Sequence, residues 1–558
     1  MEVTRANFRH VLPELNEVID KAAFVAIDCE LTGISTENNI YPCDRPEDAY
    51  RKINENSSGY ILIQLGLTAV RASDEDPEKY SYRSYNFYVF PRLWKQSFKC
   101  QGSSMTFLAE NGFDFVKLFR DGIPYCNQQQ ERELRERLEE KQKARGHILN
   151  CSEKDTSNHV PVPEDEKETL ANIRKLVDEF LSSETETEKI INDCNGFQRK
   201  LIYEMLESDY SDKITASSRV ENSFKVLVIE KKKSAEEELT IEQERRRNEQ
   251  IELEESIGIS AVMQKISKSG KLIVGHNMLL DLMHILRQCF GPLPTCFKEF
   301  KQYAHCIFPN IVDTKYVCTL PDIKCKIRNS ILAHLVQTVS EEPFTPIKLE
   351  PECEDSKYSL SENKAHEAGY DSFLTATAFL GLMGHLKILP QSLANNNDKT
   401  RSFVNKIFLM RLQDVCYINL VGLEPKTSRD HVFHVTVPEV WRQSDLVNHF
   451  RSYGPIFVTW INQSSALISL QHRENSSIVL KTIGSYPGFK VQSLADFEES
   501  LEKRLHVNED SVNPRKRKLE SLTTPSEATT SKLNKRTKKK RKEKKDKTKV
   551  FDEVDDWS

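Results

Sequence analysis

Apolar and polar positions along the first 125 residues are grouped in blocks that predict a helix, three strands and a further helix. The run FVAIDCEL at 24–31 is apolar as far as Ile27 and then carries two carboxylates, and YILIQLGLTAV at 60–70 and YNFYVFP at 85–91 are rich in β-branched and aromatic residues. Short runs of this composition are typical of buried strands. Three neighbouring strands that end on polar residues predict the start of an α/β sheet.

A polar stretch at 127–169 interrupts this pattern. It contains the charged helical segment QQQERELRERLEEKQKAR and then many Ser, Asn, Pro and Glu residues, so we predict a linker there. Residues 170–240 resume apolar periodicity in NIRKLVDEFL, GFQRKLIYEML and FKVLVIE, which predicts a small αβ insert. A second charged helix, EEELTIEQERRRNEQIELEES, leads back to the strand and helix of KLIVGHNMLLDLMHIL. We interpret that charged helix as a solvated connector rather than an RNA-binding surface.

The last patterned region, at 428–495, alternates strands and helices in the order βαββαβ, which is a ferredoxin-like order. The predicted organisation is an α/β domain in two parts at 1–169 and 241–427, the insert at 170–240, the module at 428–495 and a tail at 496–558. No internal repeat is evident.

Composition narrows the class of protein. An apolar fraction of 38% with 29% charged residues fits a soluble globular protein with solvated linkers or tails. The chain has no run of 18 apolar residues and no signal-peptide pattern at its start, so we expect an intracellular protein without a membrane segment. The 13 cysteines contain no C-x-x-C pair, which argues for reduced thiols and against a disulfide framework or a zinc ribbon.

Charge is distributed unevenly along the chain. Residues 514–549 hold 16 Lys and Arg against 4 Asp and Glu, a local excess of +12, so the net charge of −5 leaves about −17 for the remainder. Basic tails of this density are typically disordered and serve in nuclear import or nucleic-acid binding, while a merely solvated tail is the alternative. The compact run KRTKKKRKEKK at 535–545 favours nuclear import.

The two carboxylates that end the first strand are the first candidate chemistry. Asp28 and Glu30 are two residues apart, so in a strand they point to the same face and repel each other unless a cation lies between them. A solvated strand end is the alternative, because 84 Asp and Glu residues make such pairs common by chance. The pair therefore requires partners elsewhere in the chain.

Three further stretches supply such partners. GHNMLLD places Asn277 and Asp281 four residues apart on one face of a helix, HEAGYD places His366 before Asp371, and VDTKY puts Asp313 at another strand end. Taken singly, each has a structural explanation, such as a helix cap, a solvated face or a buried histidine with satisfied hydrogen bonds.

In combination, D-x-E, N-x-x-x-D and H-x-x-x-x-D in this order resemble the DEDDh exonuclease superfamily. Within it the chain resembles the poly(A)-specific deadenylase family from residue 1 to about 500, through NFYVFP, GFDF, DGIPY, GFQRKLIY, SGKLIVGHNMLLD, HEAGYD and FLMR. The resemblance implies an RNase H-like exonuclease domain of the α/β class, split by the small αβ insert. An α+β module like an RNA-recognition motif and a disordered basic tail follow.

The resemblance also implies the catalytic set. Asp28, Glu30, Asp281 and Asp371 would bind two Mg²⁺ ions, with Mn²⁺ as a substitute, because carboxylate oxygens are hard ligands that suit these cations. His366 would be the general base, since its unperturbed pKa is close to neutral. The family usually has Gly between its first two carboxylates, where this chain has Cys29. That side chain would point to the opposite face of the strand, so we expect no loss of activity.

Candidate RNA contacts follow from the same resemblance. The insert corresponds to the family's small nucleic-acid-binding domain with an Arg-x-x-x-His motif, but here Arg199 is followed by Tyr203, so a structural role is the alternative. Trp460 matches the family's cap-binding tryptophan, and packing against a partner subunit is its alternative role. Phe115 and Asn277 are further candidates for contacting RNA.

The implied function is a metal-dependent 3′-to-5′ exoribonuclease that shortens poly(A) tails and releases AMP. Implied partners are poly(A) RNA, capped mRNA and a second copy of the chain, in the nucleus and cytoplasm and with no membrane. The alternatives are an RNA-binding adaptor without catalysis, a DNA exonuclease, and a 3′-end trimmer of small non-coding RNAs.

Overall fold

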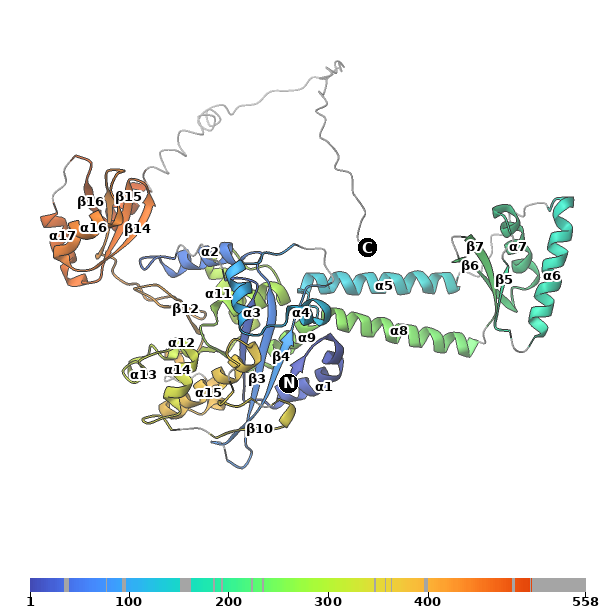
Figure 1. Ribbon diagram of the computed structural model, residues 1–558, viewed down its shortest axis with the longest axis horizontal. Coiled ribbons are helices and arrows are strands. Elements are labelled where there is room, and N and C mark those ends of the chain that lie inside the picture. Colours follow the sequence, from blue (N-terminus) through green and yellow to red (C-terminus); the bar gives the residue numbers. More distant parts are fainter. Residues whose placement is uncertain are drawn as a thin grey trace, which may run out of the picture.

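The molecule consists of a large α/β body, a small domain held away from it by two long helices, and a second small module on the opposite side (Figure 1). The structure is a computed structural model. It describes residues 1–503 apart from 35–39, 77, 93–96, 151–161, 184–185, 192–193, 222–223, 233–234, 346–347, 357, 363, 396–399, 484–486 and 502. The predicted basic tail therefore lies outside the described residues from 504 onward.

The body is built on a mixed sheet. Its strands lie in the order β1 (Glu2–Val3), β4 (Tyr80–Tyr88), β3 (Leu62–Ala72), β2 (Phe24–Leu31), β8 (Leu272–Gly275) and β9 (Ile311–Asp313), and β10 (Leu349–Pro351) pairs with β4. β3 runs antiparallel to both of its neighbours, β2 and β4, whereas β8 and β9 run parallel to β2. The predicted α/β class is confirmed.

Helices cover both faces of this sheet because alternate residues of β2 point to opposite sides. Val25 and Ile27 pack into the core beside α1 (Arg5–Lys21), α9 (Ile259–Ser269) and α10 (Leu279–Ile285). On the other face, Phe24 packs edge-on against Phe379 of α15 (Ala368–Leu386), with ring centroids 4.8 Å apart, and α14 (Leu332–Val339) completes that layer. Both faces of β2 are therefore buried.

The predicted linker at 127–169 is largely helical. α5 (Gln128–Asn150) lies alongside α8 (Ala235–Ile257), and the two helices carry the insert (Figure 1). Glu249 of α8 accepts hydrogen bonds of 2.6 Å from both terminal nitrogens of Arg145, and its carboxylate lies 3.1 Å from Lys141 Nζ. Charges of the two helices therefore pair with each other along the stalk, which sequence periodicity alone does not reveal.

The insert folds around its own core. α6 (Lys167–Ser182) and α7 (Gly196–Asp209) accompany a sheet in the order β5 (Glu188–Ile191), β7 (Phe224–Lys231) and β6 (Ile214–Glu221). Phe180, Ile202 and Leu227 are at the centre of this core.

The C-terminal module has the predicted βαββαβ order. It consists of β13 (Val432–Thr436), α16 (Gln443–Phe450), β14 (Ile456–Asn462), β15 (Ser465–Leu470), α17 (Ser476–Thr482) and β16 (Lys490–Ser493), with the sheet order β14-β15-β13-β16. Phe433, Phe450 and Ile468 form its core against the two helices.

Part of the other face of the module's sheet is covered by the chain itself. His434 of β13 stacks on Phe497, with ring centroids 3.7 Å apart and an interplanar angle of 5°. Thr459 of β14 is buried, and its hydroxyl lies 3.8 Å from Cys43 Sγ of the α/β body. Contacts between body and module therefore use the face on which RNA-recognition motifs stack bases.

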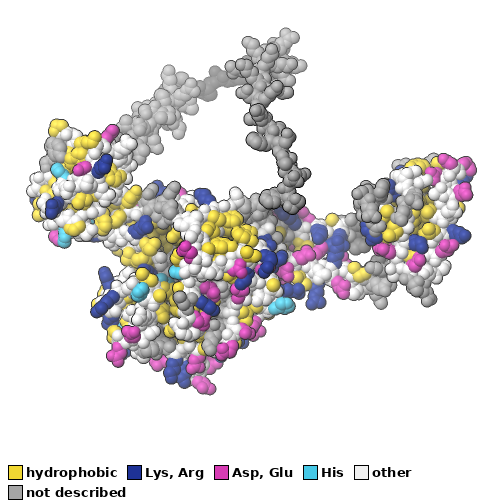
Figure 2. All heavy atoms as spheres, viewed as in Figure 1, with side chains coloured by type: hydrophobic (Ala, Val, Ile, Leu, Met, Phe, Trp, Pro, Cys, Tyr) yellow, Lys and Arg dark blue, Asp and Glu magenta, His cyan; other side chains and the backbone are white. Residues whose placement is uncertain are grey.

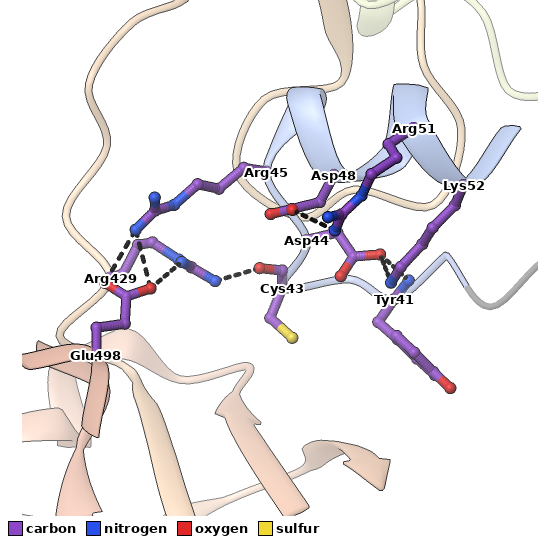
Figure 3. A network of polar contacts seen from close by, with 9 residues as sticks. All are labelled: Tyr41, Cys43, Asp44, Arg45, Asp48, Arg51, Lys52, Arg429 and Glu498. Atoms are coloured by element: carbon purple, nitrogen blue, oxygen red, sulfur yellow. Dashed lines mark hydrogen bonds and ion pairs between the residues drawn. The ribbon is translucent and has the colours of Figure 1, made fainter. Parts of the chain in front are cut away.

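Polar contacts reinforce this junction (Figure 3). Arg45 donates two hydrogen bonds of 2.9 Å to the carboxylate of Glu498, and Arg429 donates to the carbonyl oxygen of Cys43 and, at 3.3 Å, to Glu498. Two guanidinium groups thus share one carboxylate at the boundary.

Among the described residues, no helix has the length and apolar character that crossing a membrane requires. The twelve described cysteines are all free thiols.

Candidate active site

The carboxylates of Asp28 and Glu30 are presented by the part of β2 that extends beyond its parallel neighbour. β8 pairs only with residues 24–26 of β2, whereas the antiparallel strand β3 continues alongside, with Gly66 opposite Asp28 and Gln64 opposite Glu30. Directly opposite residues on paired strands share a face. Asp28 and Glu30 therefore project together from the end of β2 that extends beyond β8, on the face that α15 covers. This end of β2 is the sheet edge of the site.

β3 lets helix α15 approach this edge closely. A Cβ atom at position 66 would overlap the backbone carbonyl of Ala368, so only glycine fits there. Two residues away, Gln64 Oε1 accepts a 2.9 Å hydrogen bond from Ala368 N, one of the helix N-terminal amides that have no partner within the helix. The first turn of α15 is consequently held directly over β3.

Two more contacts fix the rotation of α15. Asn86 Oδ1 of β4 accepts a 3.1 Å hydrogen bond from Gly369 N, and the hydroxyl groups of Thr68 and Ser372 lie 2.8 Å apart. Because these contacts come from neighbouring strands, they place Asp371 above the same sheet edge as Asp28 and Glu30.

His366 lies just before α15 and contacts Asp371 through its backbone. Its amide donates a 3.1 Å hydrogen bond to Asp371 Oδ2, and its φ of 71° is in the left-handed region. Potential ligand atoms of Glu30, His366 and Asp371 all lie within 4.8 Å of one another. Residues from β2 and α15, more than 330 positions apart, thus form one cluster.

Asp281 is positioned from the other side by a turn between β8 and α10. The buried carboxylate of Asp313 accepts hydrogen bonds from the backbone amides of Asn277 at 2.8 Å, Met278 at 3.2 Å and Phe408 at 3.0 Å. Asn277 has a φ of 59°, and the turn leads into α10, whose first turn carries Asp281. Asp313 is therefore a structural anchor rather than a fifth acid of the cluster.

The pKa values show that the first two carboxyl groups of the site have close acidic neighbours. Burial raises the pKa of Asp28 well above its ordinary value, and the charges of Asp371, Asp281 and Glu30 raise it further. Burial likewise raises the pKa of Glu30, followed by the charges of Asp371 and Asp281. Asp28 and Glu30 are thus close enough to the other predicted acids to be repelled by them.

The other two carboxyl groups are also difficult to ionise. Burial raises the pKa of Asp281 to about 7, with a further contribution from Asp313. Burial raises the pKa of Asp371 to about 7, although the amide hydrogen bond from His366 opposes this increase. A divalent cation would favour the ionised form of all four groups, so this set of donors fits a hard cation such as Mg²⁺.

His366 and one aromatic residue that sequence reasoning missed lie together at the rim. Partial burial lowers the pKa of His366, which keeps its ring neutral near pH 7. The ring of Phe107, in α3 (Gly102–Glu110), meets it edge-on with centroids 4.6 Å apart, although 43% of Phe107 is exposed. The only sequence signal was an apolar residue in the polar context SSMTFLAEN.

The remaining predicted residues differ in their distance from the acids. Asn277 precedes α10, and its side-chain amide donates to Met410 Sδ at 3.6 Å beside an apolar hollow that Ile34 and Leu280 also line. Phe115 begins α4 (Phe115–Asp121) and packs against Phe113 with ring centroids 4.8 Å apart, partly buried. The structure thus brings Asn277 to the site and leaves Phe115 in a neighbouring aromatic cluster.

Arg199 and Trp460 are not brought to the acids. Arg199 is in α7 of the insert, at the far end of the α5–α8 stalk in Figure 1. Trp460 is on β14, opposite Ala466, and packs half-buried against the module core. Strand alternation turns its side chain toward the helices of the module.

Comparison with known proteins identifies relatives of both the α/β body and the C-terminal module. Residues 3–379 match the CAF1 family ribonuclease, and residues 422–500 match an RNA binding domain. The solved structure of S. pombe Pop2p in its Mg²⁺- and Mn²⁺-bound form aligns with 68% of this chain and 91% of its own, at 14% identity and a TM-score of 0.32.

Curated relatives extend the match across the module. The poly(A)-specific ribonuclease PARN of Xenopus laevis is 36% identical over 92% of this chain and 83% of its own length, and that of Homo sapiens is 37% identical over 89% and 80%. The pre-piRNA 3′-exonuclease trimmer of Bombyx mori is 25% identical over 92% of this chain and 96% of its own. The chain belongs to the CAF1 ribonuclease family, among the poly(A)-specific ribonucleases.

Proposed function

We propose that this chain is a 3′-to-5′ exoribonuclease that shortens poly(A) tails and releases AMP. The observation that carries the proposal is the convergence of Asp28, Glu30, Asp281 and Asp371 with His366 at one sheet edge, in a chain of this family. The Bombyx mori relative makes 3′ trimming of small RNAs the second candidate. It has lower identity than the poly(A)-specific relatives, so deadenylation is the better supported activity.

The four carboxylates fit a site for two Mg²⁺ ions, with Mn²⁺ as a substitute. They offer only oxygen donors, they come from three elements, and their raised pKa values indicate a site in which positive charge is favourable. Held by these carboxylates, such a pair of cations would lower the pKa of a water molecule and would stabilise the charge on the departing 3′-oxygen. Asp28 and Glu30 share one face of β2, so both can bind the same ion.

His366 would accept the proton of the attacking water. Its lowered pKa leaves the imidazole neutral and able to accept a proton at pH 7. Its backbone contact with Asp371 keeps the residue beside the acids. Phe107 borders the ring on one side, so water and substrate would approach from the remaining sides.

The proposed oligomeric state is a dimer of two copies of this chain. Phe107 of α3 and Val116 and Phe119 of α4 are 43%, 69% and 53% exposed. Figure 2 shows an apolar patch over this part of the body. Adjacent large apolar side chains on a surface favour association. Phe119→Glu, which places a charge in this patch, should convert a dimer into a monomer in light-scattering measurements.

Cap binding, RNA contacts and localisation complete the proposal. Trp460 would bind the methylated guanine of capped mRNA, and Asn277, Phe115 and Arg199 would contact RNA. The basic segment at 514–549 would direct the chain to the nucleus, with a second pool in the cytoplasm. A chain ending at 510 should retain hydrolysis but fail to accumulate in nuclei; exclusively nuclear residence of that chain would place the signal elsewhere.

The central test compares substrates in one assay. The full chain is incubated with oligo(A), oligo(U) and oligo(dA) of equal length, with Mg²⁺ or with EDTA, and released nucleotides are measured by chromatography. Rapid AMP release from oligo(A) with Mg²⁺ alone is the expected result. Equal rates on all three oligomers would contradict poly(A) specificity, and activity in EDTA would contradict the metal site.

A further inference from the structure

A two-stranded hairpin lies between the α/β body and the C-terminal module (Figure 1). β11 (Lys406–Phe408) pairs antiparallel with β12 (Tyr417–Asn419), and Leu409 N donates a 2.8 Å hydrogen bond to Cys416 O. Residues 410–415 therefore form the tip of the hairpin.

One side of the tip holds the module. Gln413 Oε1 accepts a 2.8 Å hydrogen bond from the hydroxyl of Ser469, which is 1% exposed, and Gln413 Nε2 donates at 3.4 Å to Leu470 O. The carboxylate of Asp414 accepts a hydrogen bond from Arg473. These contacts fix β15 of the module against the hairpin.

The same hairpin holds the turn that precedes Asp281. Met410 Sδ accepts the hydrogen bond from Asn277 Nδ2, and Phe408 N donates to Asp313, the carboxylate that also binds the Asn277 amide. Asn277 has a φ of 59°, which is uncommon for a residue with a side chain and persists only where surrounding contacts support it. The hairpin supplies two of those contacts.

We infer that Gln413 is a positioning residue for hydrolysis, which acts through the hairpin by holding the Asn277 turn and thereby the first turn of α10. The module contributes to turnover through this contact, without touching the acids itself. The inference rests on the proposed role of Asp281 in hydrolysis. It predicts that loosening the hairpin from the module lowers turnover even on uncapped RNA, where cap binding cannot contribute.

The test measures kcat and KM of the full chain on uncapped oligo(A). Gln413→Ala should lower kcat about two- to thirtyfold, the range expected for a residue that couples two sites, with KM and melting temperature close to wild type. Ser469→Ala should have a similar effect. The double variant should be no slower than the slower single variant, because both remove one contact.

Two further variants separate positioning from general damage. Gln471→Ala changes an exposed glutamine close to Ser469 on the module and should leave kcat unchanged. Met410→Leu keeps the side-chain volume but removes the sulfur acceptor of Asn277, so it should lower kcat in the same direction as Gln413→Ala.

Several results would overturn the inference. These are an unchanged kcat in Gln413→Ala, additive effects in the double variant, or a fall in melting temperature with kcat intact. A wild-type chain that does not hydrolyse oligo(A) would instead overturn the proposed function. An active wild type with an equally active Gln413→Ala variant would overturn only the positioning role.

Discussion

The acidic sheet edge and the sheet face of the module differ in how well their polar groups are satisfied. At the edge, Asp28 has a raised pKa because it is buried beside three other carboxyl groups. On the module, His434 stacks on Phe497 and its two ring nitrogens lie 3.3 Å from Ser465 and Gln492. The first surface gains free energy from a cationic ligand, whereas the second already has partners from its own chain.

This difference indicates that the acidic site and the sheet face of the module have different roles. RNA-recognition motifs stack bases on aromatic side chains of their central strands. Here the central strands β13 and β15 present His434, Leu467 and Ser469 on that face, and all three contact other parts of the same chain. These residues of the sheet face therefore serve in docking, whereas Phe457 of β14, opposite Ser469 and on the same face, is 37% exposed.

Loss of one carboxylate should have the largest effect on hydrolysis. Asp28→Asn, Glu30→Gln, Asp281→Asn and Asp371→Asn keep the side-chain shape but remove a charged metal ligand, so each should reduce AMP release from oligo(A) to background. Cys29→Ala, on the opposite face of the same strand, is the control and should remain active. Near wild-type turnover in any of the four acid variants would contradict a shared metal site.

Removal of the imidazole should have the next largest effect. His366→Ala should lower kcat by about a hundredfold or more, the usual scale for loss of a general base, with little change in RNA affinity. His334→Ala, at an exposed histidine of α14, is the matched control. A His366→Ala variant with normal kcat and weak binding would identify the residue as a substrate contact.

Sequence patterns predicted the parts of this site that are local. The strand of Asp28 and Glu30, the helix starts at Asp281 and Asp371, and the βαββαβ order all follow from short-range periodicity. The approach of α15 to β3 was not predictable, because Gly66 and Gln64 act on Ala368, about 300 residues away. Such a contact leaves no periodic signal in the sequence.

The sequence did not predict the stalk or the junction between the α/β body and the C-terminal module, for the same reason. A solvated charged helix and a helix whose charges pair with another helix have the same composition, and only the contact of Glu249 with Arg145 distinguishes them. Similarly, nothing local to Thr459 indicates that its hydroxyl lies 3.8 Å from Cys43 Sγ, 416 positions away in the sequence. Long-range pairing, rather than residue type, decided both outcomes.

The pH dependence of stability should reflect the raised pKa values of the acids at the sheet edge. Asp281 and Asp371 have pKa values of about 7 in the folded chain against 3.8 ordinarily, so the folded state binds protons that the unfolded state has released. Their contribution is fully present below about pH 4 and is lost as the pH rises through about 7. The melting temperature in EDTA should therefore fall between pH 5 and pH 8.

Variants and metal supply the controls for this pH dependence. Asp281→Asn should flatten the profile, Glu55→Gln at an exposed site should not, and added Mg²⁺ should raise the melting temperature more at pH 8 than at pH 5. A melting temperature in EDTA that is constant or rises over this range would contradict the raised pKa values.

Substitution of Trp460 should have the smallest of these effects, on the affinity of the module for a cap analogue. Its side chain packs half-buried against the module core on the edge strand β14, so part of the indole remains available to a ligand. A cation–π contact with a methylated guanine contributes about 0.5–2 kcal/mol, so Trp460→Ala should weaken binding of a cap analogue about two- to thirtyfold. Hydrolysis of uncapped oligo(A) should be unchanged because the acids lie in the other domain.

Trp441 packs half-buried on the same core, with its ring centroid 5.4 Å from that of Phe489, so Trp441→Ala is a matched control for lost packing. If both variants lower the melting temperature but only Trp460→Ala loses cap affinity, the indole binds the cap; equal cap affinity in both variants would assign Trp460 to packing alone.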